Sequence, residues 1–260
     1  MKTIAISGKG GTGKTTIAAL MVRWLSQHNP GSVLAVDADS NVNLNVLLGL
    51  EIKDTVGLIR EEMKQNSQNL PGGMSKAQFL EYKIQSSLVE TPAYDLIAMG
   101  RPEGPGCYCY ANNLLRDILQ TLSSHYQYII IDNEAGMEHL SRRTTLNIDH
   151  LLIISDPTVR GVRTASNISR LLSELDIRVG EKKLIINRLQ GEVPSIVTQT
   201  LDEENLELGL TIREDINLLN MEKKGDSIWT LSELSPVFLA VDKWMEIFSH
   251  KRYEDNAHGI

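Results

Sequence analysis

The chain has 260 residues, of which 42% are hydrophobic and 23% charged, and its formal net charge is −7 at pH 7. A chain of this size buries a substantial core without disulfides or oligomerisation. The negative charge and the absence of clustered Lys and Arg exclude a broad phosphate-neutralising face, so we expect no nucleic-acid partner. The sequence opens on no signal-peptide pattern and has no apolar run near the roughly 18–20 residues of a membrane span, so we expect a cytoplasmic protein with no membrane partner.

Short apolar segments recur along the chain and predict β-strands. They are Thr3–Ser7, Val33–Val36, Asp95–Met99, Tyr128–Asp132, His150–Ser155, Lys183–Asn187 and Leu208–Ile212. Apolar residues at helical spacing fill Leu114–Leu122, Ala165–Leu175 and Val237–Phe248. This alternation predicts an α/β fold, in which a mostly parallel, twisted sheet carries helices on both faces.

We expect a single domain over residues 1–250, with a surface insertion at about 54–89 and a flexible tail at 251–260. The insertion is polar, contains Pro71-Gly72-Gly73 and interrupts the alternation, which predicts helices and a surface loop. The tail from Lys251 to Ile260 is polar, so we expect it to fray.

The last predicted helix has one apolar side. That side consists of Val237, Phe238, Val241, Trp244, Met245 and Phe248. Its other side lacks the Lys and Arg enrichment of a helix that lies on a membrane surface, so we expect this helix to pack on the core.

Residues 8–16 read GKGGTGKTT, directly after the first predicted strand and before a helical run. The pattern G-x-x-x-x-G-K-[ST] in this context predicts a phosphate-binding loop (P-loop), whose backbone N–H groups form an anion nest at a helix N-terminus. Lys14 can reach the β- and γ-phosphates, and Thr15 offers a hydroxyl to Mg²⁺. Glycine is expected where a side chain would strike phosphate or forbid the backbone conformation. The predicted nucleotide-binding residues here are Gly8, Lys9, Gly10, Gly11, Thr12, Gly13, Lys14, Thr15 and Thr16.

Polar side chains follow three of the predicted strands. The second strand leads into Asp37-Ala38-Asp39-Ser40-Asn41-Val42-Asn43, the fourth into Asp132-Asn133-Glu134-Ala135-Gly136, and the sixth ends at Asn187. Open α/β sheets bind ligands at this edge, so these side chains are candidate nucleotide ligands. An amide pairs with both the donor and the acceptor edge of adenine. A helix cap is the alternative role for Asp132, and a turn former is the alternative for Asn187.

The chain has two cysteines, Cys107 and Cys109, one residue apart. In an extended segment both thiols would point to one side. The pattern from Ala111 to Leu122 predicts a helix just downstream, and the N-terminus of that helix would lower the pKa of the two thiols. One such pair is half of a thiolate site, and a two-fold axis through it would bring four sulfurs together around Zn²⁺ or Ni²⁺. Buried unreactive cysteines and a redox pair are the alternatives.

Lys9, immediately after the first glycine of the loop, resembles the signature lysine of the deviant Walker A (SIMIBI) ATPases, the class of nitrogenase iron protein, MinD and ParA. The resemblance implies a Mg²⁺-dependent ATPase that forms an ATP-dependent homodimer, in which Lys9 reaches the partner's nucleotide. The resemblance also implies roles for site residues. Lys9, Lys14 and Asp39 would be catalytic, with Asp39 orienting the attacking water and Asp37 and Asn43 supporting Asp39. Thr15, Asp39 and Asp132 would bind Mg²⁺, Gly136 would contact the γ-phosphate, and Asn187 would read the adenine. Ser40 departs from the family pattern, which has proline there.

Three segments together resemble a narrower branch over Met1–Phe248. They are GKGGTGKTT, the CxC before a helix, and Asp132–Thr144, and they are similar to the CooC-type ATPases that mature nickel-containing carbon monoxide dehydrogenase, with relatives that serve acetyl-CoA synthase. The resemblance implies a metallochaperone that dimerises with ATP, holds nickel or zinc through Cys107 and Cys109, and delivers nickel to such a client. An iron–sulfur reductase similar to nitrogenase iron protein and a positioning ATPase similar to MinD or ParA remain alternatives.

Overall fold

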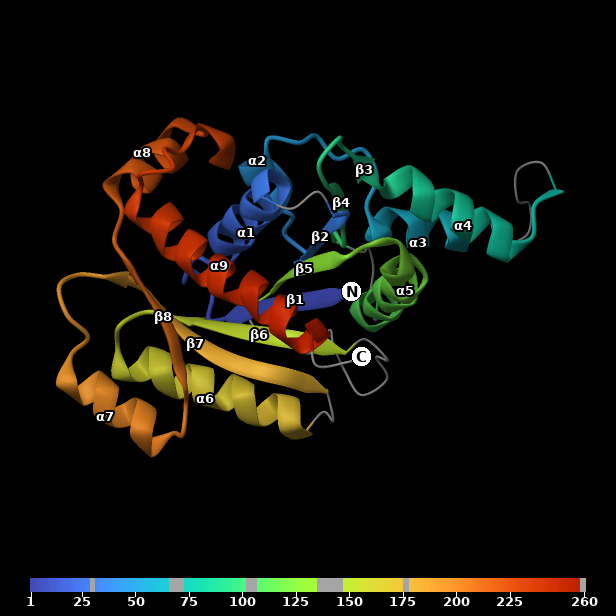
Figure 1. Ribbon diagram of the computed structural model, residues 1–260. Helices are drawn as coiled ribbons and strands as arrows, with labels where there is room; N and C mark the ends of the chain where they lie inside the picture. The colour runs from blue at the N-terminus through green and yellow to red at the C-terminus, as the bar shows by residue number, and fades with distance from the viewer. Residues whose placement is uncertain (29–30, 66–72, 102–106, 135–146, 175–177, 258–260) are drawn as a thin grey trace.

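A computed structural model describes residues 1–28, 31–65, 73–101, 107–134, 147–174 and 178–257 (Figure 1). Its eight strands form one sheet in the order β3-β4-β2-β5-β1-β6-β7-β8. The strands are β1 (Lys2–Gly8), β2 (Val33–Ala38), β3 (Val89–Glu90), β4 (Asp95–Ala98), β5 (Tyr128–Asn133), β6 (Ile148–Ser155), β7 (Val179–Leu189) and β8 (Leu208–Arg213). Every neighbouring pair is parallel except β3 and β4. The predicted mostly parallel sheet is confirmed.

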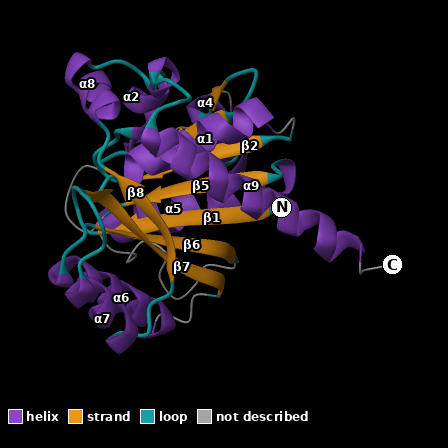
Figure 2. Ribbon diagram, turned by 60° about the vertical axis from the view of Figure 1, so that its left-hand side comes forward, coloured by secondary structure: helices purple, strands orange, loops and turns teal. Residues whose placement is uncertain are grey.

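Helices cover both faces of the sheet, as Figures 1 and 2 show. They are α1 (Lys14–His28), α2 (Leu44–Leu48), α3 (Val56–Gln65), α4 (Lys76–Ser87), α5 (Cys107–Leu122), α6 (Val159–Glu174), α7 (Ser195–Glu203), α8 (Ile216–Lys224) and α9 (Pro236–Ala257). One hydrophobic cluster joins the sheet to α1, α2, α8 and α9, and a second joins it to α3–α7. Ile4 and Ile6 of β1 belong to the first cluster and Ala5 between them to the second, because successive strand residues point to opposite faces.

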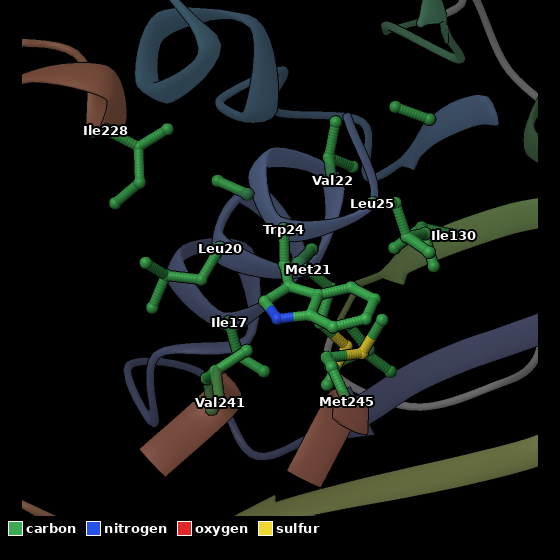
Figure 3. Packing of buried hydrophobic residues seen from close by; sticks show 14 of the residues in the cluster. Ile17, Leu20, Met21, Val22, Trp24, Leu25, Ile130, Ile228, Val241 and Met245 are labelled. Atoms are coloured by element: carbon green, nitrogen blue, oxygen red, sulfur yellow. The ribbon is translucent and has the colours of Figure 1, made fainter. Parts of the chain in front are cut away.

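The helix that follows the phosphate loop lies in the middle of the first cluster. From Ile17 to Leu25 every residue of α1 is buried, and α9 packs over it through Val241 and Met245 (Figure 3). The Trp24 indole donates a 2.6 Å hydrogen bond to Asp242 Oδ1 on α9. The one charged residue of this stretch, Arg23, donates to the Ile228 and Leu231 carbonyl oxygens. A helix buried on all sides is a core helix, so the loop at its start is anchored on a fixed support.

The closing helix packs on the core, as predicted. Five of its six predicted core residues are buried and Trp244 is half-buried. The helix continues to Ala257, into the segment for which the polar sequence predicts fraying. No helix in the described part of the chain is long and apolar enough to cross a bilayer.

Other boundaries differ from the sequence predictions for local reasons. Helix α6 starts at Val159 rather than at Ala165, because the Thr158 hydroxyl accepts a 3.0 Å hydrogen bond from the Gly161 N–H and caps the helix before its apolar pattern begins. The insertion forms α3 and α4, and α4 projects away from the sheet in Figure 1. The two-residue strand β3 was not predicted, since a segment so short shows no periodicity.

Candidate nucleotide site

The phosphate loop leaves β1 at Gly8 and enters α1 at Lys14. Two of its glycines are required by the backbone. Gly8 has φ 146° and a Cβ there would lie 2.3 Å from the Ile154 carbonyl oxygen; Gly13 has φ 94° and a Cβ there would lie 2.5 Å from Asn187 Nδ2. Gly10 has no positive φ and no atom lies within 4 Å of its Cβ position, so of the two expected reasons for glycine there, backbone conformation and a clash with phosphate, only the second applies. Open space at Gly10 leaves room for a phosphate.

The two lysines of the loop lie in different surroundings. Lys14 is buried, and its ammonium group lies 3.5 Å from the Lys9 carbonyl oxygen, which also accepts a 2.8 Å hydrogen bond from the Thr12 hydroxyl. The Lys14 charge therefore sits inside the curve of its own loop. The Lys9 side chain is exposed. One lysine of the loop is therefore held in place by burial, and the other is open to solvent.

Asp132, at the end of β5, lies directly beside the loop. Its side chain is buried and accepts a hydrogen bond from the Thr15 hydroxyl, while its Oδ1 has no hydrogen-bond partner in the described residues. Burial raises the pKa of Asp132 to about 7; the nearby charges of Asp37 and Asp39 add to this, and Thr15 and Lys14 oppose it. A buried carboxylate oxygen without a donor, next to a hydroxyl, is the oxygen-rich ligand set that Mg²⁺ prefers.

The segment after β2 is organised by Asp37. Its carboxylate accepts backbone N–H bonds from Asp39 (3.1 Å), Asn43 (2.9 Å) and Leu44 (2.9 Å), which fixes the segment and the start of α2. Burial raises the pKa of Asp37, and these backbone bonds oppose the rise. Asp39 is half-buried, and its carboxylate accepts a 2.7 Å bond from the Asn41 N–H. Asp37 thus shapes the loop that carries Asp39.

Asn187 lies on the other side of the phosphate loop. Its Nδ2 donates a 2.8 Å hydrogen bond to the Thr12 carbonyl oxygen, and its Oδ1 accepts a 2.9 Å bond from the Arg188 N–H. An amide with these two bonds keeps one N–H and one lone pair for a ligand. Asn187 lines a pocket of about 200 Å³, together with Gly13 and Thr16 of the loop.

The same pocket holds residues that sequence reasoning missed. They are Arg188 on β7, Arg213 and Asp215 at the end of β8, and Glu222 on α8, which accepts a 3.2 Å hydrogen bond from the Thr16 hydroxyl. The signal that could have found Arg213 and Asp215 is their position at the end of the seventh predicted strand, at the same sheet edge as the phosphate loop.

The cysteine pair lies in a different local structure from the one predicted. Helix α5 begins at Cys107, so both cysteines occupy its first turn rather than an extended segment. The argument that an extended chain points both thiols to one side is therefore wrong, because positions two apart on a helix do not face each other. The side chains of residues 107–113, like Gly136, lie outside the described residues. Among the residues whose side chains are described, no three His, Cys, Asp or Glu are grouped to hold a metal ion.

Comparison with known proteins identifies clear relatives. Residues 1–186 match the model of the AAA domain family. The chain is 40% identical over 252 residues to an uncharacterized ATP-binding protein of Methanocaldococcus jannaschii, covering 96% of this chain and 99% of that protein. It is 31% identical over 195 residues to the carbon monoxide dehydrogenase accessory protein CooC of Rhodospirillum rubrum, covering 67% of this chain and 70% of that protein. The septum site-determining protein MinD of Pyrococcus horikoshii, solved with Mg-ADP, has the same fold, with a TM-score of 0.69, 21% identity and 95% of each chain covered.

Proposed function

This chain belongs to the AAA domain family of P-loop ATPases, in the MinD and ParA class, and from that premise we propose that it is an ATP-driven metallochaperone. It dimerises with nucleotide, binds nickel or zinc through Cys107 and Cys109 at the dimer interface, and supports nickel insertion into carbon monoxide dehydrogenase or acetyl-CoA synthase. The similarity to CooC, a carbon monoxide dehydrogenase accessory protein, supports this choice of client.

The nucleotide half of the proposal rests on the groups around the phosphate loop. Lys14, buried inside the curve of the loop, contacts the β- and γ-phosphates. Thr15, Asp39 and Asp132 hold Mg²⁺, because Asp132 Oδ1 has no hydrogen-bond partner among the described residues and needs a cation or a donor. A bound Mg²⁺ would neutralise charge that develops on the phosphate oxygens during hydrolysis. Asp39 orients the attacking water, and the exposed Lys9 extends to the nucleotide of the second protomer.

The metal half rests on the position of the cysteine pair, which is the observation that carries the proposal. Strand β4 ends beside the segment that Asp37 organises, where the Met99 N–H donates a 2.8 Å hydrogen bond to the Asp37 carbonyl oxygen, and α5 begins shortly afterwards at Cys107. The chain therefore leaves the nucleotide edge of the sheet just before the two cysteines. A dimer that closes over ATP at this edge would bring two such pairs together.

Four thiolates bind a borderline-soft metal ion far better than two, so metal affinity should rise when ATP closes the dimer and fall when hydrolysis opens it. Linkage requires the converse: metal that prefers the closed dimer strengthens nucleotide-bound association by the same factor. The helical start of α5 is compatible with this arrangement, because a helix N-terminus lowers thiol pKa and favours the thiolate.

The test replaces one ligand at a time, with Cys107→Ser and Cys109→Ser. Equilibrium dialysis of the wild type with ATP should give half a nickel or zinc ion per protomer, and both variants should lose metal-promoted dimerisation while they still bind ATP. Client activation in cells should fail in the same variants. If the two serine variants bind nickel and zinc as tightly as the wild type does, the proposal is overturned. A protein that is brown after anaerobic purification and contains near-stoichiometric iron and sulfide would favour an iron–sulfur reductase instead.

A further inference from the structure

The last residue of β5, Asn133, lies where three strands of the nucleotide site meet. It follows Asp132 directly and is buried. Strand β5 lies between β1, which leads into the phosphate loop, and β2, which leads into the segment of Asp37 and Asp39. A group that fixes the end of β5 against its neighbours therefore fixes the parts of the nucleotide site relative to one another.

The pairing of β5 extends further along one neighbour than along the other. Along β2 it continues to the pair Ala38 and Asn133, whereas along β1 it ends at the pair Ile6 and Asp132. At this end the Asn133 side chain adds a bond, because its Nδ2 donates a 2.9 Å hydrogen bond to the Ile6 carbonyl oxygen. The amide thus ties the end of β5 to β1 just before the phosphate loop leaves β1 at Gly8.

The Asn133 side chain lies on the face of the sheet opposite the phosphate loop. Ile130 belongs to the first hydrophobic cluster, with α1, and Ile131 to the second, because successive strand residues point to opposite faces. By the same alternation Asp132 points toward α1, where it accepts the Thr15 hydrogen bond, and Asn133 points away from it. Asn133 therefore acts on the site only through the backbone that it shares with Asp132.

Only one end of the Asn133 amide is used by the described residues. Its Oδ1 is buried and has no hydrogen-bond partner among them. A buried polar atom without a partner is destabilising, whereas an apolar side chain of the same shape is close to neutral or stabilising. Leucine has the same branching at Cγ and lacks only the polar atoms. The feature that leucine cannot supply is the N–H bond to the Ile6 carbonyl oxygen.

We infer that Asn133 is a positioning residue that holds Asp132 in place for Mg²⁺, an inference that rests on the proposed Mg²⁺ binding by Asp132. Thr15 belongs to α1, which follows the phosphate loop of β1, so the approach of Asp132 to the Thr15 hydroxyl depends on how β5 sits against β1. The phosphate loop itself is part of the β1–α1 connection and does not need β5. Loss of the Asn133 amide should therefore weaken metal binding and spare the nucleotide.

The test separates metal from nucleotide by measuring ADP binding in isothermal titration calorimetry, in EDTA and at a series of Mg²⁺ concentrations. Asn133→Leu should bind ADP in EDTA as the wild type does. The Mg²⁺ concentration at which ADP binding tightens should rise roughly 10-fold or more, as is typical when a group that orients a metal ligand is removed. Thermal unfolding without ligand should show that the variant is at least as stable as the wild type.

Ser155→Ala is the matched control. Ser155 is buried at the end of β6, on the other side of β1, but its hydroxyl donates a 2.8 Å hydrogen bond to the carbonyl oxygen of the adjacent Asp156 and not to another strand. This variant also loses a buried polar group at the same sheet edge. It should leave both ADP measurements unchanged.

Two results would overturn the inference: an unchanged Mg²⁺ requirement in Asn133→Leu, or ADP binding that is weakened equally with and without Mg²⁺, which would mean that the amide supports the whole loop. If leucine does not fit and the variant unfolds, Asn133→Ala removes the same N–H without added bulk and is judged by the same ADP measurements.

Asp132→Asn is the reference for the proposed Mg²⁺ site. If this variant needs no more Mg²⁺ than the wild type, the proposed role of Asp132 fails, and the role of Asn133 fails with it. If Asp132→Asn needs more Mg²⁺ and Asn133→Leu does not, only the positioning role of Asn133 is rejected.

Discussion

Replacing Asp132 with asparagine should stabilise the ligand-free protein at neutral and alkaline pH. Burial raises the pKa of Asp132 from 3.8 to about 7. Each pKa unit corresponds to about 1.4 kcal/mol, so ionising this carboxyl costs about 4 kcal/mol more in the folded state than in the unfolded chain. The asparagine side chain has nearly the same shape and never ionises, so the variant avoids that cost.

The pH dependence of this effect has a defined sign. The folded state holds the Asp132 proton more tightly than the unfolded chain does, so the wild type loses stability as pH rises from about 4 to about 7 and has the full penalty above that range. The variant should therefore exceed the wild type in unfolding free energy by about 2 kcal/mol at pH 5 and by about 4 kcal/mol at pH 8.

Urea denaturation in EDTA at several pH values measures this difference. Titrating groups that do not interact with Asp132 are common to both proteins and cancel in the difference, so only Asp132 and the neighbouring Asp37 and Asp39 contribute to it. Asp226→Asn, at an exposed site on the loop after α8, is the control substitution. Mg²⁺ with ADP should stabilise the wild type at pH 8 more than the variant, which lacks the carboxylate. A stability difference that does not change between pH 5 and pH 8 would refute the reasoning.

Four further changes follow from the geometry of the site. Lys14→Ala should abolish productive nucleotide binding, and ATP hydrolysis at the wild-type rate in this variant would contradict that role. Asp39→Ala should bind ATP and accumulate as a dimer with little turnover, and failure of this variant to dimerise with ATP would contradict the role of Asp39. Gly8→Ala should destabilise the fold by at least about 2 kcal/mol in urea, since its Cβ would meet the Ile154 carbonyl oxygen, and a change below about 0.5 kcal/mol would show that the clash is absent. Arg188→Asn should keep or raise stability by up to about 1 kcal/mol in urea, because asparagine tolerates a positive φ; a loss of stability would mean that the arginine side chain supports the fold.

The sheet was predictable from sequence because its central strands are buried on both faces. Such strands read as continuous apolar runs, as in Tyr128–Asp132, and they end where polar residues of the site begin. Asp132 and Asn187 could be found in this way without knowledge of the fold. The phosphate loop could be found from its spacing alone, since the positive φ at Gly8 and Gly13 admits few other residues.

The rest of the site depends on contacts between distant segments. Arg213 and Arg188 line the same pocket only because β8 pairs with β7, and no pattern in the sequence reports that pairing. The left-handed backbone of Arg188 is equally hidden, since arginine carries no signal for it. Helix α8 did carry a signal that was overlooked: Asp215 caps its start and Gly225 ends it with φ 71°.

The cysteine pair shows how a local argument can fail. The first turn of α5 reads Cys107-Tyr108-Cys109-Tyr110 and lacks the apolar spacing of the later turns, so periodicity places the helix start too late. Because the helix begins at Cys107, the backbone of the pair is helical and not extended. This leaves the proposed metal site dependent on how two copies meet, which a single chain does not determine.

Native mass spectrometry of the wild type with Mg²⁺, a nonhydrolysable ATP analogue and one equivalent of Ni²⁺ or Zn²⁺ tests the central claim most directly. The proposal predicts a dimer that carries two nucleotides and one metal ion, and predicts that the metal ion is lost when either cysteine is replaced by serine. A nucleotide-bound dimer without metal, or a monomer that binds metal equally well with and without the analogue, would contradict it.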